Sequence, residues 1–176
     1  MKNDSRLVLD TNTVMALWLF RDPGLAPLAA HCESPGCVLL GRADALEELR
    51  RVLAYRQFAV PVETQAAILN DYAARLAGGG DEAGADDATA APPALPACRD
   101  PDDQKFLEIA RDRAATHLVT RDKALLRLAR HRLVRERFRI LTPERFGAEA
   151  LERFRILTPE RFVAELADAL APDARP

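Results

Sequence analysis

Four short apolar runs, separated by longer segments with helical periodicity, are the feature that most limits how this chain can fold. Each run is too short for a helix and typical of a buried strand, and they lie at residues 6–10, 37–41, 117–120 and 138–141. Strands that alternate with helices in this way predict one α/β domain, with a central parallel sheet covered by helices on both faces.

The helices are predicted from apolar stripes and from residues that favour helix ends. Thr11–Thr13 can open a helix with Val14–Phe20 as its apolar body, and three leucines share one face of Ala43–Leu53. Thr142 and Pro143 suit the N-cap and the first position of a last helix. Further helices are expected at 61–76, from the acids at 100–103 to about 115, and at 123–131.

Composition favours a single folded domain in the cytoplasm. The 176 residues leave room for one core, and no apolar run reaches the ~18 residues of a transmembrane helix. The start, MKNDSRLVLD, lacks the apolar core of a signal peptide. Cys32, Cys37 and Cys98 are not spaced like zinc ligands and are expected to be free thiols.

Two segments depart from this regular pattern. Residues 77–97 are rich in glycine, alanine, acids and proline, which predicts a flexible loop or insertion. The eleven residues ERFRILTPERF at 136–146 recur unchanged at 152–162, which indicates a tandem duplication. We expect the first copy to complete a domain of residues 1–146. The second copy would form a surplus strand and helix in an extension, 147–176, that packs on the sheet edge or pairs with another molecule in a dimer or higher oligomer.

Acidic residues follow two of the predicted strands. Asp10 ends the first run and Asp122 follows the third. Ligands of open parallel sheets bind beyond the carboxyl ends of the strands, so both carboxylates are expected at one crevice.

A third acid is expected there from the helix that starts near residue 100. Asp100 precedes a proline and suits the N-cap, a role that needs no ligand. Asp103 shares a helix face with Phe106, Leu107 and Ala110 and should therefore lie at the top of the buried face, towards the sheet. We select Asp103 as the site residue.

Helical phase also separates two neighbouring glutamates. At about 100° per residue, Glu47 lies nearly opposite the apolar stripe, whereas Glu48 lies just beyond the edge formed by Ala45 and Val52. If only the leucines define the stripe, the two are almost equally placed. Glu48 is the better candidate, because an acid at the core boundary needs a cation, a hydrogen bond or an exit to water.

Converging carboxylates repel one another and raise their pKa values unless a cation neutralises them. Mg²⁺ or Mn²⁺ suits an all-carboxylate site, takes one or two acids directly and keeps several waters. Such a site can generate a hydroxide nucleophile and stabilise the transition state of phosphodiester hydrolysis, without a covalent enzyme intermediate.

Arginines are concentrated in RLARHRLVRERFR, residues 127–139, which contains only one acid. This segment can neutralise phosphates, or it can be an ordinary solvated helix surface. The net charge of −2 does not decide between the two interpretations.

Five ordered segments carry a resemblance to a known family. They are LVLDTNTVMALWLF, ALEELRRVL, RDPDDQKFLEIA, LVTRDKALL and RILTPERF. Together they resemble the PIN-domain family, and most closely the VapC-like ribonuclease toxins of bacterial toxin–antitoxin systems. The resemblance covers about residues 6–146 apart from the 77–97 loop.

The resemblance implies a three-layer α/β/α fold, metal-dependent cleavage of single-stranded RNA and neutralisation by a cognate antitoxin. The family's acidic positions fall on Asp10, Glu48, Asp103 and Asp122. Asn12 and Thr120 match two polar positions that support the first and last acids. Asp100 matches an acid common in this branch.

The chain also departs from the family pattern. Many relatives have a glycine before the last acid and another acid two residues after it, where this chain has Arg121 and Ala124. Arg121 can bind substrate phosphate or weaken metal binding. The alternative function is a PIN-like module that binds RNA or protein without cleaving. A haloacid-dehalogenase-like phosphatase is disfavoured by Asn12, and a receiver domain is disfavoured by the poor match of Lys123.

Overall fold

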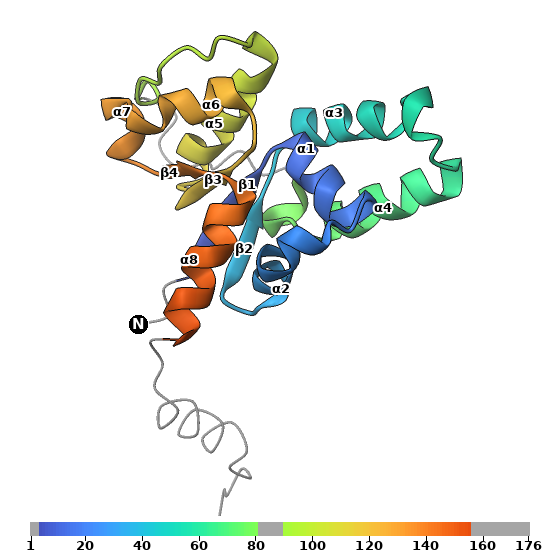
Figure 1. Ribbon diagram of the computed structural model, residues 1–176. Helices are drawn as coiled ribbons and strands as arrows, with labels where there is room; N and C mark the ends of the chain where they lie inside the picture. The colour runs from blue at the N-terminus through green and yellow to red at the C-terminus, as the bar shows by residue number, and fades with distance from the viewer. Residues whose placement is uncertain (1–3, 81–89, 156–176) are drawn as a thin grey trace, which may run out of the picture.

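The computed structural model describes residues 4–80 and 90–155 and contains the predicted parallel sheet (Figure 1). The strands lie in the order β2-β1-β3-β4, and all of them run parallel. They are β1 Ser5–Leu9, β2 Cys37–Leu40, β3 His117–Val119 and β4 Arg139–Leu141. Val8 lies opposite Leu40 on one side and Leu118 on the other. The predicted α/β class is therefore confirmed.

Helices connect the strands. Their bounds are α1 Thr11–Val14 with a π-helical continuation Met15–Leu19, α2 Ala26–Glu33, α3 Ala43–Leu53, α4 Val62–Arg75, α5 Gln104–Asp112, α6 Lys123–Arg127, α7 Arg132–Arg135 and α8 Pro143–Arg155. Short 3-10 turns lie at Pro23–Leu25, Arg56–Phe58, Ala77–Gly80, Pro101–Asp103 and Leu128–Arg130. Helix α2 was not predicted, and the expected 123–131 helix ends early in a 3-10 turn that precedes α7.

Alternate residues of the strands face two hydrophobic cores. Leu7 and Leu9 belong to the core shared with α1, α2, α3, α4 and α8, whereas Val8 belongs to the core shared with α5, α6 and α7. This division follows from the two-residue period of a strand. Figure 1 shows α5, α6 and α7 on one side of the sheet and α1 to α4 on the other. The sheet is the middle of three layers.

Both ends of the predicted loop at 77–97 lie within the described residues. Residues 77–80 form a 3-10 turn, and 81–89 lie outside the described residues. At the far end of the loop, the Cys98 N–H donates a hydrogen bond to the Gln104 side-chain oxygen at 2.6 Å. The Gln104 side-chain amide donates one to the Pro96 carbonyl at 3.2 Å. Pro96 and Cys98 are both buried, so this end of the segment is fixed to the domain.

The first copy of the duplicated segment and the first four residues of the second lie within the described part of the chain. The first copy supplies β4 and the start of α8, as expected. In the second copy, residues 152–155 continue α8, and the surplus strand and helix stay a prediction. The remainder lies outside the described residues. Because α8 runs through residue 146, the division of the chain there stays a prediction. Within 4–80 and 90–155, no helix has both the length and the apolar character needed to cross a bilayer.

Candidate active site

Asp10 directly follows β1 at the carboxyl edge of the sheet. It is the N-cap of α1, and its Oδ1 accepts a hydrogen bond from the Thr13 N–H at 2.9 Å. The residue is only 4% exposed. Burial raises the pKa of Asp10, and the charge of Asp122 adds to this effect, while hydrogen bonds from Thr120 and Thr13 oppose it. A buried acid with a raised pKa gains stability from a nearby cation.

Thr120, the residue after β3, connects two of the predicted site acids. Its hydroxyl donates to Asp10 Oδ2 at 2.5 Å and accepts from the Asp122 N–H at 2.9 Å. The side chain is completely buried. Asp122 in turn caps α6, because its Oδ1 accepts from the Ala124 and Leu125 N–H groups at 2.8 and 3.0 Å. One hydroxyl thus joins the ends of the two central strands.

Glu48 reaches the same edge from α3. The Thr11 hydroxyl donates to its Oε2 at 2.5 Å, and the Lys105 ammonium lies 3.2 Å from its Oε1. Its side chain is 18% exposed, whereas that of Glu47 is 52% exposed and paired with Arg50. Helical phase therefore distinguished the two glutamates correctly, and the catalytic role of Glu48 stays a prediction.

Asp103 lies where the other acids converge. Its pKa is raised to about 6, first by burial and then by the charges of Asp122, Asp100, Asp10 and Glu48. These residues come from the ends of β1 and β3, from α3 and from the turn before α5. The charges of all these acids act on Asp103, and the assignment of the four acids to one catalytic site stays a prediction.

Three supporting residues have different surroundings. Asp100 is the N-cap of the turn before α5, and its Oδ1 accepts from the Asp102 N–H at 3.0 Å. Asn12 is exposed, and no hydrogen bond joins its side chain to another described residue. Thr11, which sequence reasoning did not select, is buried and binds Glu48 instead. Thr11 thus supports Glu48 and not Asp10, and the supporting role of Asn12 stays a prediction.

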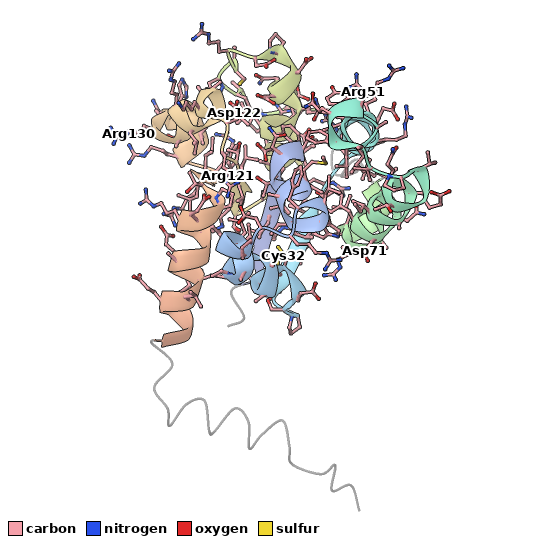
Figure 2. All side chains as sticks on the ribbon, turned by 45° about the vertical axis from the view of Figure 1, so that its right-hand side comes forward. Cys32, Arg51, Asp71, Arg121, Asp122 and Arg130 are labelled. Atoms are coloured by element: carbon pink, nitrogen blue, oxygen red, sulfur yellow. The ribbon has the colours of Figure 1, made fainter. Side chains whose placement is uncertain are left out.

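Arg121 is already paired with two acids. Its guanidinium donates to Glu144 Oε1 at 2.8 and 2.5 Å and to Asp22 Oδ2 at 3.1 Å. Figure 2 labels Arg121 near the start of α8, close to Asp122. Binding of a substrate phosphate would have to compete with these pairs. The predicted substrate contact of Arg121 thus stays a prediction, and Asp22 and Glu144 are neighbours that the sequence did not reveal.

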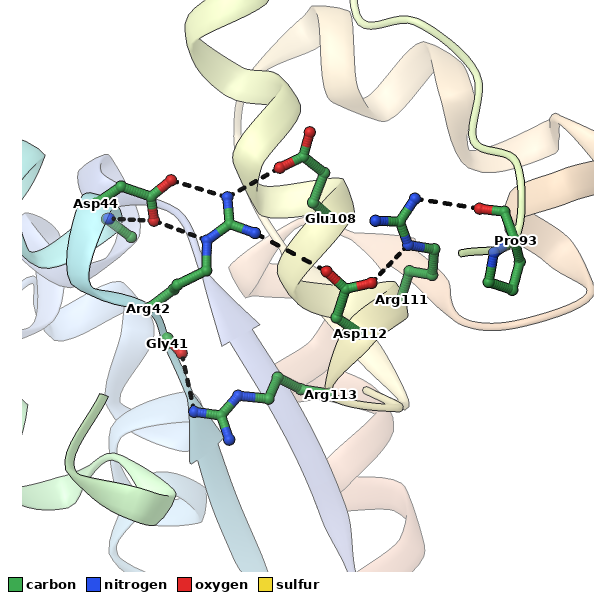
Figure 3. Close-up of polar contacts among 9 residues, drawn as sticks. Gly41, Arg42, Asp44, Pro93, Glu108, Arg111, Asp112 and Arg113 are labelled. Carbon is green, nitrogen blue, oxygen red and sulfur yellow. Dashed lines mark hydrogen bonds and ion pairs between the residues drawn. The ribbon is translucent and has the colours of Figure 1, made fainter. Parts of the chain in front are cut away.

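An ion-pair network holds the start of α3 against α5 (Figure 3). Arg42 pairs with Asp44 at 2.8 Å, with Glu108 at 2.9 Å and with Asp112 at 3.9 Å. These partly exposed pairs contribute little stability individually. Their consequence is positional, because they join the helix that carries Glu48 to the helix that follows Asp103.

The donor chemistry of the cluster fits a hard divalent cation, since the converging ligands are carboxylate oxygens. Within the described part of the chain, no three His, Cys, Asp or Glu side chains form a ready-made metal-binding group. Both oxygens of Asp10 and both of Glu48 already have polar partners, so a cation would exchange with some of these contacts.

Lys105 is the cation next to the cluster, and its removal gives a test. We expect Lys105→Met to lower the Mn²⁺ concentration at half saturation, because the Lys105 ammonium lies beside Glu48. A unit charge ~8 Å from a divalent cation opposes its binding by roughly 1 kcal/mol in water, about fivefold in affinity. Isothermal titration measures the change. Lys105→Arg keeps the charge and should bind Mn²⁺ like the wild type; weaker binding by Lys105→Met would contradict the electrostatic argument.

Comparison with known proteins agrees with this arrangement. A family model for the PIN domain matches residues 6–124, a range that includes β1, β2, β3 and the clustered acids. Neither the comparison with curated proteins nor that with solved structures found a match. The matched range covers more than half of the chain, and the chain belongs to the PIN domain family.

Proposed function

We propose that this PIN domain is a metal-dependent endoribonuclease that hydrolyses single-stranded RNA, and that it is the toxin of a toxin–antitoxin pair. The observation that carries the proposal is the buried Thr120 hydroxyl that joins Asp10 to Asp122 at the carboxyl edge of the sheet in a PIN domain. The raised pKa of Asp103, caused first by burial and then by four other carboxylates, is consistent with it. So much negative charge at one sheet edge destabilises the metal-free protein, and a bound cation would relieve this repulsion.

Each residue of the site has a proposed task. Asp10, Asp103 and Asp122 would hold Mg²⁺ or Mn²⁺, directly or through water. Such a cation, when bound, activates water and neutralises charge on the phosphate. Thr120 fixes the Asp10 carboxylate and the Asp122 backbone relative to each other. Glu48, held by Thr11 and Lys105, would orient water near the scissile phosphate.

The two adjacent glutamates provide a matched test of this assignment. We expect Glu48→Gln to lower RNA cleavage about 10- to 100-fold, as for other residues that orient ligands and water at metal sites. Glu47→Gln removes the same charge from the wet face of the same helix and should leave cleavage within about twofold of wild type. Cleavage of a labelled single-stranded RNA with Mg²⁺ or Mn²⁺, and with EDTA as control, measures both.

The same assay distinguishes the proposed nuclease from the non-cleaving alternative. A purified protein that binds RNA without any metal-stimulated cleavage would favour the binding module. Cleavage that survives both Asp10→Asn and Asp103→Asn would contradict the roles given to these acids.

The toxin assignment adds a claim about partners. We propose that a cognate antitoxin neutralises the nuclease and that the chain forms a dimer or higher oligomer, with the duplicated C-terminal segment as a candidate contact. Expression of the wild type should arrest bacterial growth, and Asp103→Asn should not. Co-expression of the protein encoded by the adjacent gene should restore growth. Equal growth arrest by wild type and Asp103→Asn would exclude nuclease activity as the cause.

A further inference from the structure

A groove with a basic rim lies beside the acid cluster. It has a volume of about 290 Å³, and Arg127, Arg130 and Arg145 line it together with Thr142. The apolar side chains of Leu126, Ile140 and Leu141 also line it. No carboxylate is among the lining residues. We call these three arginines and Thr142 the basic groove.

The ion pairs among the described residues leave part of the basic groove's charge without an acidic partner. Arg127 and Arg130 are exposed and have no ion pair with an acid there, and the same holds for Arg135 and Arg137 outside the groove. Arg145 shares Glu149 with Arg139. The groove therefore has more positive charge than its surroundings neutralise.

The basic groove begins at the same sheet edge as the acid cluster. Thr142 directly follows β4, and the Thr120 N–H donates to the Leu141 carbonyl at 2.9 Å. Helix α6 is capped by Asp122 and ends at Arg127. Its five residues span about 7.5 Å at 1.5 Å per residue. In Figure 2, the label of Asp122 lies nearer the centre of the molecule and that of Arg130 nearer its outer edge.

We propose that the basic groove binds phosphates of the RNA strand next to the bond that is cleaved. This inference rests on the proposed function and extends it to the path of the substrate. A guanidinium donates two parallel hydrogen bonds to a phosphate, which suits arginine to this task. The strand would cross the carboxyl edge of the sheet, with its scissile phosphate at the carboxylates and flanking phosphates at Arg127, Arg130 and Arg145. Under this proposal, the phosphate-binding interpretation of the 127–139 segment would apply to its first part, and the choice between the two interpretations stays a prediction.

Binding of a labelled single-stranded RNA in EDTA at several salt concentrations tests the proposal. Arg127→Gln/Arg130→Gln should weaken binding about tenfold at low salt. It should also reduce the slope of log K against log salt by about 1.4, since each lost phosphate contact removes about 0.7 for a single strand. The control Arg132→Gln/Arg135→Gln removes the same charge from α7 outside the groove, and should change affinity less than about twofold.

The outcomes separate this proposal from the proposed function. An equal loss in both double variants, an unchanged slope, or no RNA binding by the wild type would overturn the basic groove. Because binding is measured without metal, it does not depend on cleavage. Wild-type protein that binds RNA through the groove and never cleaves it would overturn the nuclease alone. Cleavage by a protein whose Arg127→Gln/Arg130→Gln variant binds RNA normally would overturn the groove alone.

Discussion

Thr120→Val should lower the free energy of unfolding by about 3 kcal/mol, which corresponds to a fall in Tm of roughly 6–12 °C. Valine matches threonine in shape but has no hydroxyl, so the variant loses the bond to the buried Asp10 carboxylate and the acceptor for the Asp122 N–H. Hydrogen bonds to charged groups contribute about 1.5–3 kcal/mol, more than neutral ones, and a buried group left without its partner adds to the loss. Urea unfolding measures the change.

Two variants control for the shape of the side chain. Thr13→Val also removes a buried hydroxyl, which donates a long bond of 3.3 Å to the Val119 carbonyl and also helps to lower the pKa of Asp10, though less than Thr120 does. It should cost about 1 kcal/mol. Thr120→Ser keeps the hydroxyl and should recover most of the stability that Thr120→Val loses. Equal losses for Thr120→Val and Thr13→Val would show that Thr120 has no special part in joining the acids.

Asp103→Asn should have opposite effects on activity and stability. Loss of one charged group at the centre of the site is expected to lower cleavage on the order of 10²–10³-fold. In EDTA at neutral pH, the same variant should be more stable than wild type by roughly 1 kcal/mol. Full linkage from a pKa of about 6 against 3.8 gives about 3 kcal/mol, and screening of this partly exposed side chain reduces it.

The stability difference should depend on pH in a defined direction. The folded-state pKa of Asp103 is raised, so the folded protein binds this proton more tightly than the unfolded chain. Ionisation therefore destabilises wild type as pH rises through the interval from 3.8 to about 6, and the penalty is complete above it. The advantage of Asp103→Asn should be present at pH 7 and absent below pH 3.8. An advantage that grows as pH falls would contradict the raised pKa, and Mn²⁺ should stabilise wild type more than the variant.

The strands and most of the acid cluster were predictable because they depend on local patterns. A short apolar run that ends in an acid places Asp10 at the carboxyl edge of a parallel sheet whatever surrounds it. Helical phase placed Glu48 and Asp103 for the same reason, since the stripe of α3 and that of α5 both face the core.

Contacts between distant segments were not predictable. The pairing of Thr11 with Glu48 joins residues 37 positions apart, and that of Arg121 with Asp22 joins residues 99 positions apart. Helix α2 has no marked apolar stripe, and only Leu28 and Cys32 of its residues are buried, so its sequence gives a weak signal. The duplicated segment is the clearest case. Residues 136–139 form a turn and the first residue of β4, whereas the identical residues 152–155 continue α8, so this short sequence does not fix its own conformation.

We propose that the clustered carboxylates support hydrolysis of RNA by water with the help of a divalent cation. The most direct test is to incubate purified protein with end-labelled single-stranded RNA, with and without Mn²⁺, and to analyse the new RNA ends. We expect cleavage that requires Mn²⁺, stops with EDTA and is lost in Asp10→Asn. The products should lack a 2′,3′-cyclic phosphate, because the nucleophile is water and not the ribose 2′-hydroxyl. Cleavage that persists in EDTA, or that leaves cyclic phosphate ends, would contradict this proposal.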